Sequence, residues 1–336
     1  MKTIKKFIKK SFMTWVYVED EKMSLIMEIK DLVYVMSKTK FSCPGIKDGY
    51  YFVDSTESIK MKNAIKLVDN FSVIYDFESE GYKLVDNIGS KIKLTEVDGL
   101  ESNDILKDVN YTSNNVSRKF LEDMKKCEKS SSCDKNRYFM MSVYIDNENK
   151  CLVSTDGRRL VRAGYTDVLD FKFNKSNAVI VNKEWVKLVE EKKESKLLLS
   201  EKYICLENDY YYLFGKYIEG MFPNYRRVIP EYKDVVNHSI DFSILLNCPK
   251  TVVNGSTITN KNVAFWELSP IATNNALLPL EDNMSITFNN DYLVDLWKML
   301  DKKVTEVKVG YNKEKIISAW RFTWDNMDYV LMPMNY

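Results

Sequence analysis

Hydrophobic and polar positions follow the same order at three places along the chain. Each place begins with a short apolar stretch, passes through Asp, Ser or Asn at a helix N-cap position, and continues with about three turns of helical spacing. The three places are 51–68 (YFVDSTESIKMKNAIKLV), 178–190 (AVIVNKEWVKLVE) and 285–300 (SITFNNDYLVDLWKML). The pattern predicts a strand, a cap and a helix at each of them.

A second feature recurs after each predicted helix. The stretches that follow are rich in β-branched and aromatic residues and contain a polar turn, which is typical of paired strands. They lie at 71–85, 196–215 and 304–324. A unit that occurs three times in 336 residues indicates a repeated domain of roughly 110 residues rather than a short solenoid repeat.

The leading halves of the repeats are less regular. Residues 114–129 form a capped helix pattern that precedes predicted strands at 137–146 and 150–155. The matching helix of the third copy, near 241–255, is interrupted by a proline, and in the first copy it is reduced to residues 2–10. We therefore expect three domains, 1–110 with a shortened N-terminal half, 111–235 and 236–336.

The number of helices limits the architecture. Two helices per copy cannot cover both faces of about eight strands, so they must lie on one side with antiparallel sheets outside. The predicted fold class is α+β.

Composition argues against chemistry at a metal or a histidine. The cysteines contain no C-x-x-C pair, and His238 is the single histidine, so no clustered metal ligands are present. The acidic stretches 146–149 and 76–80 read as polar turns rather than as the paired carboxylates of a metal-dependent nuclease. We expect no catalytic residues, no metal, no cofactor and no enzyme activity.

The chain also lacks the patterns of membrane and secreted proteins. No apolar run approaches the ~18 residues of a membrane span, and the basic N-terminus is not followed by the apolar core of a signal peptide. We expect a cytoplasmic protein that does not bind membranes.

Charge is distributed unevenly although the net charge is only +1. The six predicted helical segments carry a net charge of +8, and the remainder carries −7. One interpretation is that lysine simply favours solvated helix faces. The other is a basic helical surface that attracts the phosphates of duplex DNA without reading bases. The candidates are Lys5, Lys6, Lys9, Lys60, Lys62, Lys66, Arg118, Lys119, Lys125, Lys126, Lys187 and Lys298.

Three motifs connect this pattern to a known family. They are STDGRRLVRAGY at 154–165, GMFPNYRRVIP at 220–230 and YVLMPMNY at 329–336. With them the chain resembles the bacterial sliding clamp, the β subunit of DNA polymerase III, in a divergent or phage-encoded form. Weaker similarity runs through 114–230, 284–336 and about 71–103.

The resemblance implies both an architecture and a function. Two three-domain subunits would close head to tail into a ring, with helices lining the inner face around duplex DNA and sheets outside. The protein would be a processivity factor with the replicative polymerase and the clamp loader as partners. By the same resemblance Ile92 and Leu94 would lie at the subunit interface, opposite Val252 and Val253.

The resemblance also implies a pocket for partner peptides between the second and third domains. Leu, Val, Pro and Met side chains would form an adaptable apolar slot, and Arg159 and Arg227 would offer donors to the peptide. The carried-over lining is Met140, Thr155, Gly157, Arg158, Arg159, Leu160, Pro223, Arg227, Val228, Val330, Leu331, Met332, Pro333 and Met334.

The same residues can also be interpreted as purely structural, without a peptide pocket. Residues 155–157 (TDG) are also a hairpin turn, Phe222 and Tyr225 are candidate core residues, and 330–334 are a candidate final strand. Pro333 favours an edge or a pocket wall over a central strand.

Departures from the family pattern concern the pocket. Arg158 stands where the family often has His, and Asn335 and Tyr336 replace the usual last two residues, so we expect a more acidic or more aromatic peptide.

The shortened first copy and the near-neutral pI of about 7.4 leave an alternative function open. It is a clamp-like monomer or decoy, which binds partner peptides without encircling DNA.

Overall fold

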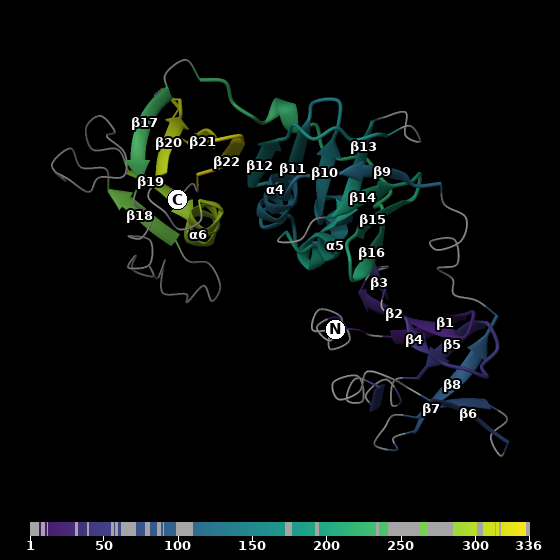
Figure 1. Ribbon diagram of the computed structural model, residues 1–336. Helices are drawn as coiled ribbons and strands as arrows, with labels where there is room; N and C mark the ends of the chain where they lie inside the picture. Colours follow the sequence, from purple (N-terminus) through teal and green to yellow (C-terminus); the bar gives the residue numbers. More distant parts are fainter. Residues whose placement is uncertain are drawn as a thin grey trace, which may run out of the picture. The chain divides into compact units, whose positions relative to one another are not determined.

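The computed structural model describes residues 7, 11, 13–30, 33–38, 40–54, 57, 60–61, 72–77, 81–85, 89, 91–98, 110–171, 177–191, 195–232, 235–240, 263–267, 285–300, 305–312, 314–315 and 317–333. They belong to two compact units, each described by itself below (Figure 1). The first unit comprises 1–121 and 167–218, and the second comprises 122–166 and 219–336. Residues of the predicted domain 111–235 occur in both units, so the division into three domains stays a prediction.

Twelve strands of the first unit form one antiparallel sheet. Its order is β6-β7-β8-β5-β1-β2-β3-β16-β15-β14-β9, with β4 paired to β2. The strands are β1 (Met13–Glu19), β2 (Lys22–Lys30), β3 (Val33–Ser37), β4 (Phe41–Ser42), β5 (Gly49–Val53), β6 (Ser72–Asp76), β7 (Gly81–Val85), β8 (Lys91–Val97), β9 (Thr112–Asn115), β14 (Lys196–Leu199), β15 (Tyr203–Glu207) and β16 (Tyr211–Lys216). The pairing of β3 with β16 joins the predicted first and second domains.

Period-2 burial explains why these stretches are strands. In β1 the buried positions are Thr14, Val16 and Val18, and the residues between them are more exposed. β13 (Ala178–Asn182) and the short helix α5 (Lys183–Leu188) also belong to this unit. Asn182 caps α5, because its side chain accepts a hydrogen bond from the backbone N–H of Glu184 at 2.8 Å.

Seven strands of the second unit follow one another in the antiparallel order β10-β11-β12-β22-β21-β20-β17. They are β10 (Ser142–Asp146), β11 (Cys151–Thr155), β12 (Arg159–Gly164), β17 (Val235–Ile240), β20 (Thr305–Gly310), β21 (Trp320–Trp324) and β22 (Met327–Leu331). A separate pair consists of β18 (Val263–Glu267) and β19 (Ser285–Asn289). β12 pairs with β22 from Arg159 opposite Leu331 to Ala163 opposite Met327, which joins the predicted second and third domains.

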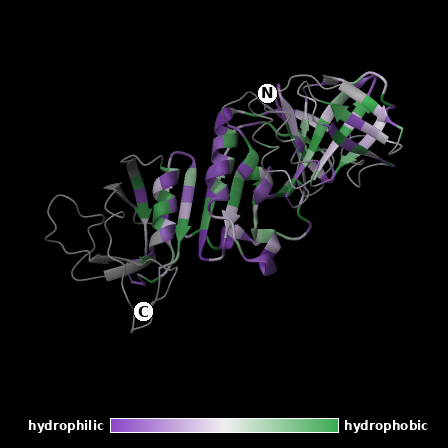
Figure 2. Ribbon diagram, turned by 90° about the horizontal axis from the view of Figure 1, so that it is seen from below, coloured by the Kyte–Doolittle hydropathy of each residue, from purple (hydrophilic) through white to green (hydrophobic). Residues whose placement is uncertain are grey.

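The helices α4 (Arg118–Glu128) and α6 (Asn290–Met299) carry both hydrophobic and hydrophilic residues (Figure 2). The described helical elements also include the 3-10 helices η1 (Lys135–Met140) and η2 (Tyr225–Arg227). In α4 the buried hydrophobic residues are Phe120, Leu121, Met124 and Cys127. Their spacing of three and four residues forms one apolar stripe.

Most of the predicted elements are confirmed. The stretches 71–85, 196–215 and 304–324 contain paired antiparallel strands, and 114–129 and 285–300 contain α4 and α6. Of the predicted helices 2–10, 57–69 and 241–253, the structure describes only residues 7, 57, 60 and 61, all helical.

Three expectations need correction. Residues 137–140 belong to η1 rather than to a strand, because Asp134 caps that turn by accepting from the backbone N–H of Asn136. The predicted helix after residue 183 ends at Leu188, where Val189 takes a non-helical ψ of 133°. β22 is a central strand, since it ends two residues before Pro333 and the proline therefore does not interrupt the pairing.

Two kinds of feature are absent from the described residues. No helix among them has the length and apolar character that a membrane crossing requires. No group of three or more His, Cys, Asp or Glu side chains in that part of the chain is placed to hold a metal ion.

Candidate functional site

The turn between β11 and β12 is built by the side chains of Thr155 and Asp156. The Thr155 hydroxyl donates to the carbonyl of Arg159 at 2.6 Å and accepts from the backbone N–H of Gly157 at 3.0 Å. The Asp156 carboxylate accepts from the N–H groups of Arg158 and Arg159 at 2.9 and 3.1 Å. Gly157 has φ +90°, a conformation that glycine adopts without strain. The hairpin turn predicted at 155–157 is confirmed.

Arg159 lies beneath this turn and is only 8% exposed. Its Nε donates to Asp156 at 3.0 Å, its Nη1 to Asp295 of α6 at 2.8 Å, and its Nη2 to the Lys129 carbonyl at 2.8 Å. The guanidinium carbon is 4.2 Å from the centre of the Tyr292 ring, a cation–π contact. Arg159 therefore connects α6, the segment after α4 and the β11–β12 turn.

The environment of Arg159 gives it a structural role. Burial alone lowers the pKa of the guanidinium, but Tyr329, Asp295 and Asp156 together raise it above its ordinary value. Each guanidinium nitrogen already donates one hydrogen bond within the protein, which uses three of its five N–H donors. We conclude that it stabilises the wall of the site.

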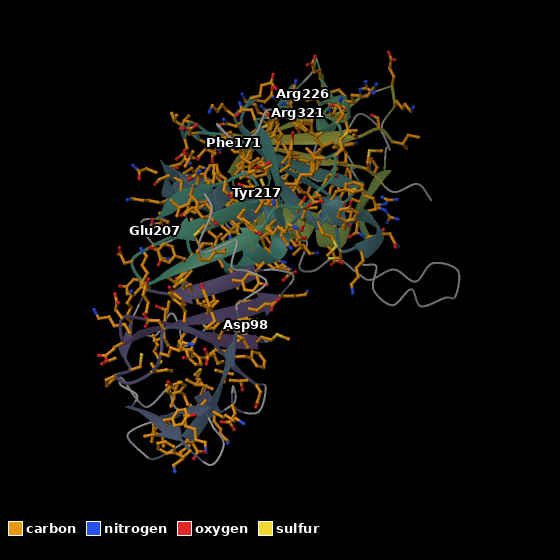
Figure 3. The ribbon with its side chains drawn as sticks, turned by 90° about the vertical axis from the view of Figure 1, so that its right-hand side faces the viewer. Asp98, Phe171, Glu207, Tyr217, Arg226 and Arg321 are labelled. Carbon is orange, nitrogen blue, oxygen red and sulfur yellow. The ribbon has the colours of Figure 1, made fainter. Side chains whose placement is uncertain are left out.

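The segment around residues 222–228 forms a second wall. Phe222 stacks on Tyr144 with the ring centres 4.7 Å apart and 4° between the planes. The Tyr225 hydroxyl donates to Asp146 at 2.8 Å and lies 3.2 Å from the Cys151 sulfur, and burial raises the pKa of Tyr225. Both aromatic residues are buried, which confirms that they are partly structural. Arg226, labelled in Figure 3, is an exposed neighbour of Tyr225.

The two walls enclose a cavity of about 310 Å³ inside the second unit. This volume lies at the lower end of the range for sites that bind small ligands or peptide side chains. Ten predicted residues line it: Met140, Thr155, Gly157, Arg158, Arg159, Leu160, Pro223, Val228, Val330 and Met332. We call this cavity the pocket.

Four predicted residues are not part of the described lining. Val330 and Met332 line the pocket whereas Leu331 between them does not, because neighbouring side chains along a strand point to opposite faces. Arg227 is exposed, and Pro333 is likewise not among the lining residues. Met334 lies outside the described residues.

Three lining residues were missed, namely Arg137, Asn224 and Tyr225. Asn224 and Tyr225 belong to the quoted 220–230 motif, so the motif itself was a signal for them. Arg137 was assigned to a strand, and η1 instead brings its Nη1 to 3.2 Å from the place where a Cβ on Gly157 would lie. The absence of a side chain at Gly157 thus leaves room for Arg137.

The described candidates for DNA contact are all on helices. Lys60, Lys187 and Lys298 are exposed and pair with carboxylates three residues earlier, Glu57 at 2.6 Å, Glu184 at 2.9 Å and Asp295 at 3.2 Å. On α4, Arg118 and Lys119 are exposed and Lys125 and Lys126 are half-buried. Lys5, Lys6, Lys9, Lys62 and Lys66 lie outside the described residues.

The interface candidates Ile92 and Leu94 are buried on β8, at 0% and 2% exposure. Residues 91–94 pair with β7, whereas residues 95–97 pair with β5. Among the strands that the structure describes, none pairs with the other edge of 91–94. Val252 and Val253 lie outside the described residues.

Sequence similarity to curated proteins covers part of the chain. No family model matches the chain. The chain is 34% identical over 126 residues to the beta sliding clamp of Rickettsia felis, which covers 33% of this chain and 32% of that protein. The aligned segment therefore spans about a third of that curated relative.

Solved structures extend the likeness to the whole chain. A DNA polymerase sliding clamp from Caulobacter crescentus matches 100% of this chain and 98% of its own with a TM-score of 0.76 and 16% identity. A DNA polymerase III subunit beta from Pseudomonas aeruginosa, bound to griselimycin, matches over the same shares with a TM-score of 0.72 and 15% identity. The resemblance inferred from the three motifs is confirmed: the chain has the fold of the bacterial β sliding clamps along its whole length and is similar to one in sequence over about a third of it.

Proposed function

We propose that this protein is a cytoplasmic DNA sliding clamp, a processivity factor whose subunits close head to tail around duplex DNA. The replicative polymerase and the clamp loader are its proposed partners, and they dock in the pocket. The observation that carries the proposal is the fit of the full chain to the sliding-clamp fold, together with a pocket that contains residues from all three motifs. A head-to-tail contact that closes after two copies gives a ring without free ends.

The pocket supports the tethering part of the proposal. Its apolar lining includes Met140, Leu160 and Val330, which are almost fully buried, and Val228 and Met332, which are exposed at 56% and 44%. Flexible methionines and a partly exposed rim suit a short segment with Leu or Phe anchors. A polymerase held in this way has a high effective concentration at the primer end, which is processivity.

The open edge of β8 supports ring closure. Residues 91–94 have paired backbone on the β7 side, and the backbone N–H of Lys93 also donates to the Glu57 side chain at 3.0 Å. A strand from a second copy would pair with the groups of the other edge, displacing Glu57 where they meet. The proposed contact is between this edge and the segment that contains Val252 and Val253. Inside such a ring, many weak contacts from helical lysines to phosphates would allow sliding without base recognition.

The alternative is a clamp-like monomer or decoy that binds partner peptides without encircling DNA. One observation favours it, because the exposed helical residues Lys60, Lys187 and Lys298 each pair with a carboxylate of their own helix. Such pairing lowers the positive potential that DNA would meet.

Two measurements separate these functions. Light scattering after size-exclusion chromatography should give about twice the 39.4 kDa of the chain, and the protein loaded on nicked circular DNA should stay bound until the circle is cut. A monomeric mass with equal loss from circles and linear DNA would refute the ring. Lys125→Glu with Lys126→Glu should shorten retention on circles, whereas Lys40→Glu with Lys47→Glu, on exposed non-helical residues, should leave it unchanged.

A further inference from the structure

The strands β6, β14 and β20 occupy the same place in the three copies of the repeat. Each follows the predicted helix of its copy and pairs with the next strand along the chain. On their other side, β14 pairs antiparallel with β9, and β20 pairs antiparallel with β17. β6 instead ends the twelve-stranded sheet, and no strand in the described part of the chain pairs with this edge (Figure 1). The repeat therefore predicts an extended strand where β6 has an open edge.

The open edge of β6 carries exposed aromatic side chains. Tyr75 and Phe77 are 45% and 84% exposed, and their ring centres lie 5.1 Å apart. The Tyr75 ring is 5.2 Å from that of Tyr82 on β7, which is 5.7 Å from the fully buried ring of Tyr51 on β5. A row of aromatic rings thus runs from the core of the first unit to its open edge and ends in two rings that face solvent.

The second copy shows the same strand position with its edge paired. Leu197 and Leu199 of β14 lie opposite Asn114 and Thr112 of β9 and are fully buried. The Thr112 hydroxyl also donates to the Leu199 carbonyl at 3.2 Å. A strand beside β6 would cover Tyr75 in the way that β9 covers the edge of β14.

Charge limits which strand can add to this edge. Residues 67–82, which include β6, contain no Lys or Arg and four acidic residues, namely Asp69, Asp76, Glu78 and Glu80. Lys83 of β7 offsets part of this charge, because it forms an ion pair with Asp76. A second copy of β6 would bring more negative charge to the same place, whereas a strand with basic residues would be attracted.

We propose that the open edge of β6 binds an extended, basic segment of a partner protein, which adds an antiparallel strand to the sheet. The backbone of β6 supplies hydrogen bonds, and apolar side chains of the segment pack on Tyr75 and Phe77. The site belongs to the first unit, whereas the pocket belongs to the second. It goes beyond the proposed function and does not depend on it.

Fluorescence polarisation with three labelled heptapeptides tests the proposal. The first probe, Lys-Val-Lys-Val-Lys-Val-Lys, has the alternation and the charge of the proposed segment. The second, Lys-Val-Lys-Pro-Lys-Val-Lys, keeps the charge and interrupts strand pairing, because proline has no backbone N–H. The third, Glu-Val-Glu-Val-Glu-Val-Glu, reverses the charge. We expect the first probe to bind about tenfold more tightly than either of the others.

Variants and amide exchange locate the binding. Tyr75→Ser with Phe77→Ser should weaken binding of the first probe about tenfold, because two aromatic contacts are lost. Tyr210→Ser is the matched control, since Tyr210 is 43% exposed in the turn before β16 of the same unit, and it should leave the affinity unchanged. In the parent protein the first probe should slow deuterium exchange at 72–76 and leave exchange in β12 unchanged. Circular dichroism confirms that each variant is folded.

Each contrary outcome overturns a stated part of the proposal. If the first probe does not bind, the edge is not a peptide site. If the proline probe binds equally well, strand addition is wrong, and if the acidic probe does, the basic preference is wrong. If Tyr75→Ser with Phe77→Ser lowers the solution mass of the protein alone, a second copy occupies the edge in place of a partner. None of these outcomes decides whether the pocket binds peptides or whether a ring closes through β8.

Discussion

Neutralising the charge of Asp328 is expected to destabilise the second unit. It lies on the central strand β22 with its side chain 5% exposed. Arg162 of β12 donates to it at 3.0 Å, and Arg321 of β21, labelled in Figure 3, donates from Nε at 2.8 Å and contacts it from Nη2 at 2.7 Å. Thr323 donates to the same carboxylate at 3.0 Å. One carboxylate thus connects three adjacent strands.

The change Asp328→Asn keeps the shape and removes the charge. An amide NH₂ would then face guanidinium donors, so at least one charge-assisted hydrogen bond is lost. Removing one partner of a buried pair costs about 3–5 kcal/mol, but Arg162 and Arg321 are 34% and 29% exposed and water compensates part of the loss. We therefore expect a free energy of unfolding lower by about 2 kcal/mol, a fall in Tm of about 4–8 °C for a unit of this size.

Scanning calorimetry with near-UV circular dichroism measures this shift. The matched control is Asp325→Asn, since Asp325 is exposed in the β21–β22 turn with φ +43°, a conformation that Asn tolerates. It should move Tm by less than 1 °C, in keeping with surface substitutions of about 0.5 kcal/mol or less. If both variants had the same Tm, the carboxylate would not stabilise the three strands.

Two further predictions concern the turn and the effect of pH. Gly157→Ala should cost about 1–2 kcal/mol, because alanine is strained at a φ of +90°, and should weaken peptide binding by displacing Arg137. Gly164→Ala, with only ordinary contacts at 3.7 Å or more, is the control, and an equal loss in both would contradict the explanation. Burial raises the pKa of Tyr50 to about 12 and that of Cys43 to about 11. The folded state retains these protons more tightly than the unfolded chain, so stability in urea should be complete below about pH 9 and fall as pH rises towards 12. Tyr50→Phe should reduce that fall, and a stability that stays constant from pH 8 to 11 would refute it.

Local features were predictable because their causes lie within a few residues. The caps expected at 178–190 and 285–300 are present, with Asn289 accepting from the N–H of Asp291 at 2.9 Å as Asn182 does from Glu184. The turn at 155–157 follows from the Thr-Asp-Gly sequence in the same way. Nine of the ten correctly predicted lining residues belong to the three family motifs, which lie close together in the fold, and Met140 lies in the weaker similarity at 114–230.

Features that depend on distant residues were not predictable. The ion pair of Arg159 with Asp295 was not foreseen, because Asp295 is 136 residues away in the sequence. Nothing near Arg159 indicates that a carboxylate of α6 reaches it. The absence of Leu331 from the pocket lining could have been predicted, because side chains alternate along a strand and Leu331 lies between Val330 and Met332. The position of Arg137 in the pocket could not be predicted, because residues 137–140 were expected to begin a strand and instead belong to the 3-10 helix η1.

The pairing of β12 with β22 has a consequence for protein synthesis. Leu160 lies opposite Val330, and the ribosome adds the second residue about 170 positions after the first. At ~5–20 residues per second, this gap amounts to roughly 10 to 30 s. During that interval one wall of the pocket exists without its neighbour. If partners dock in this pocket as proposed, an unfinished chain would lack part of their site until translation has passed residue 332, and unfinished copies would not compete with mature ones.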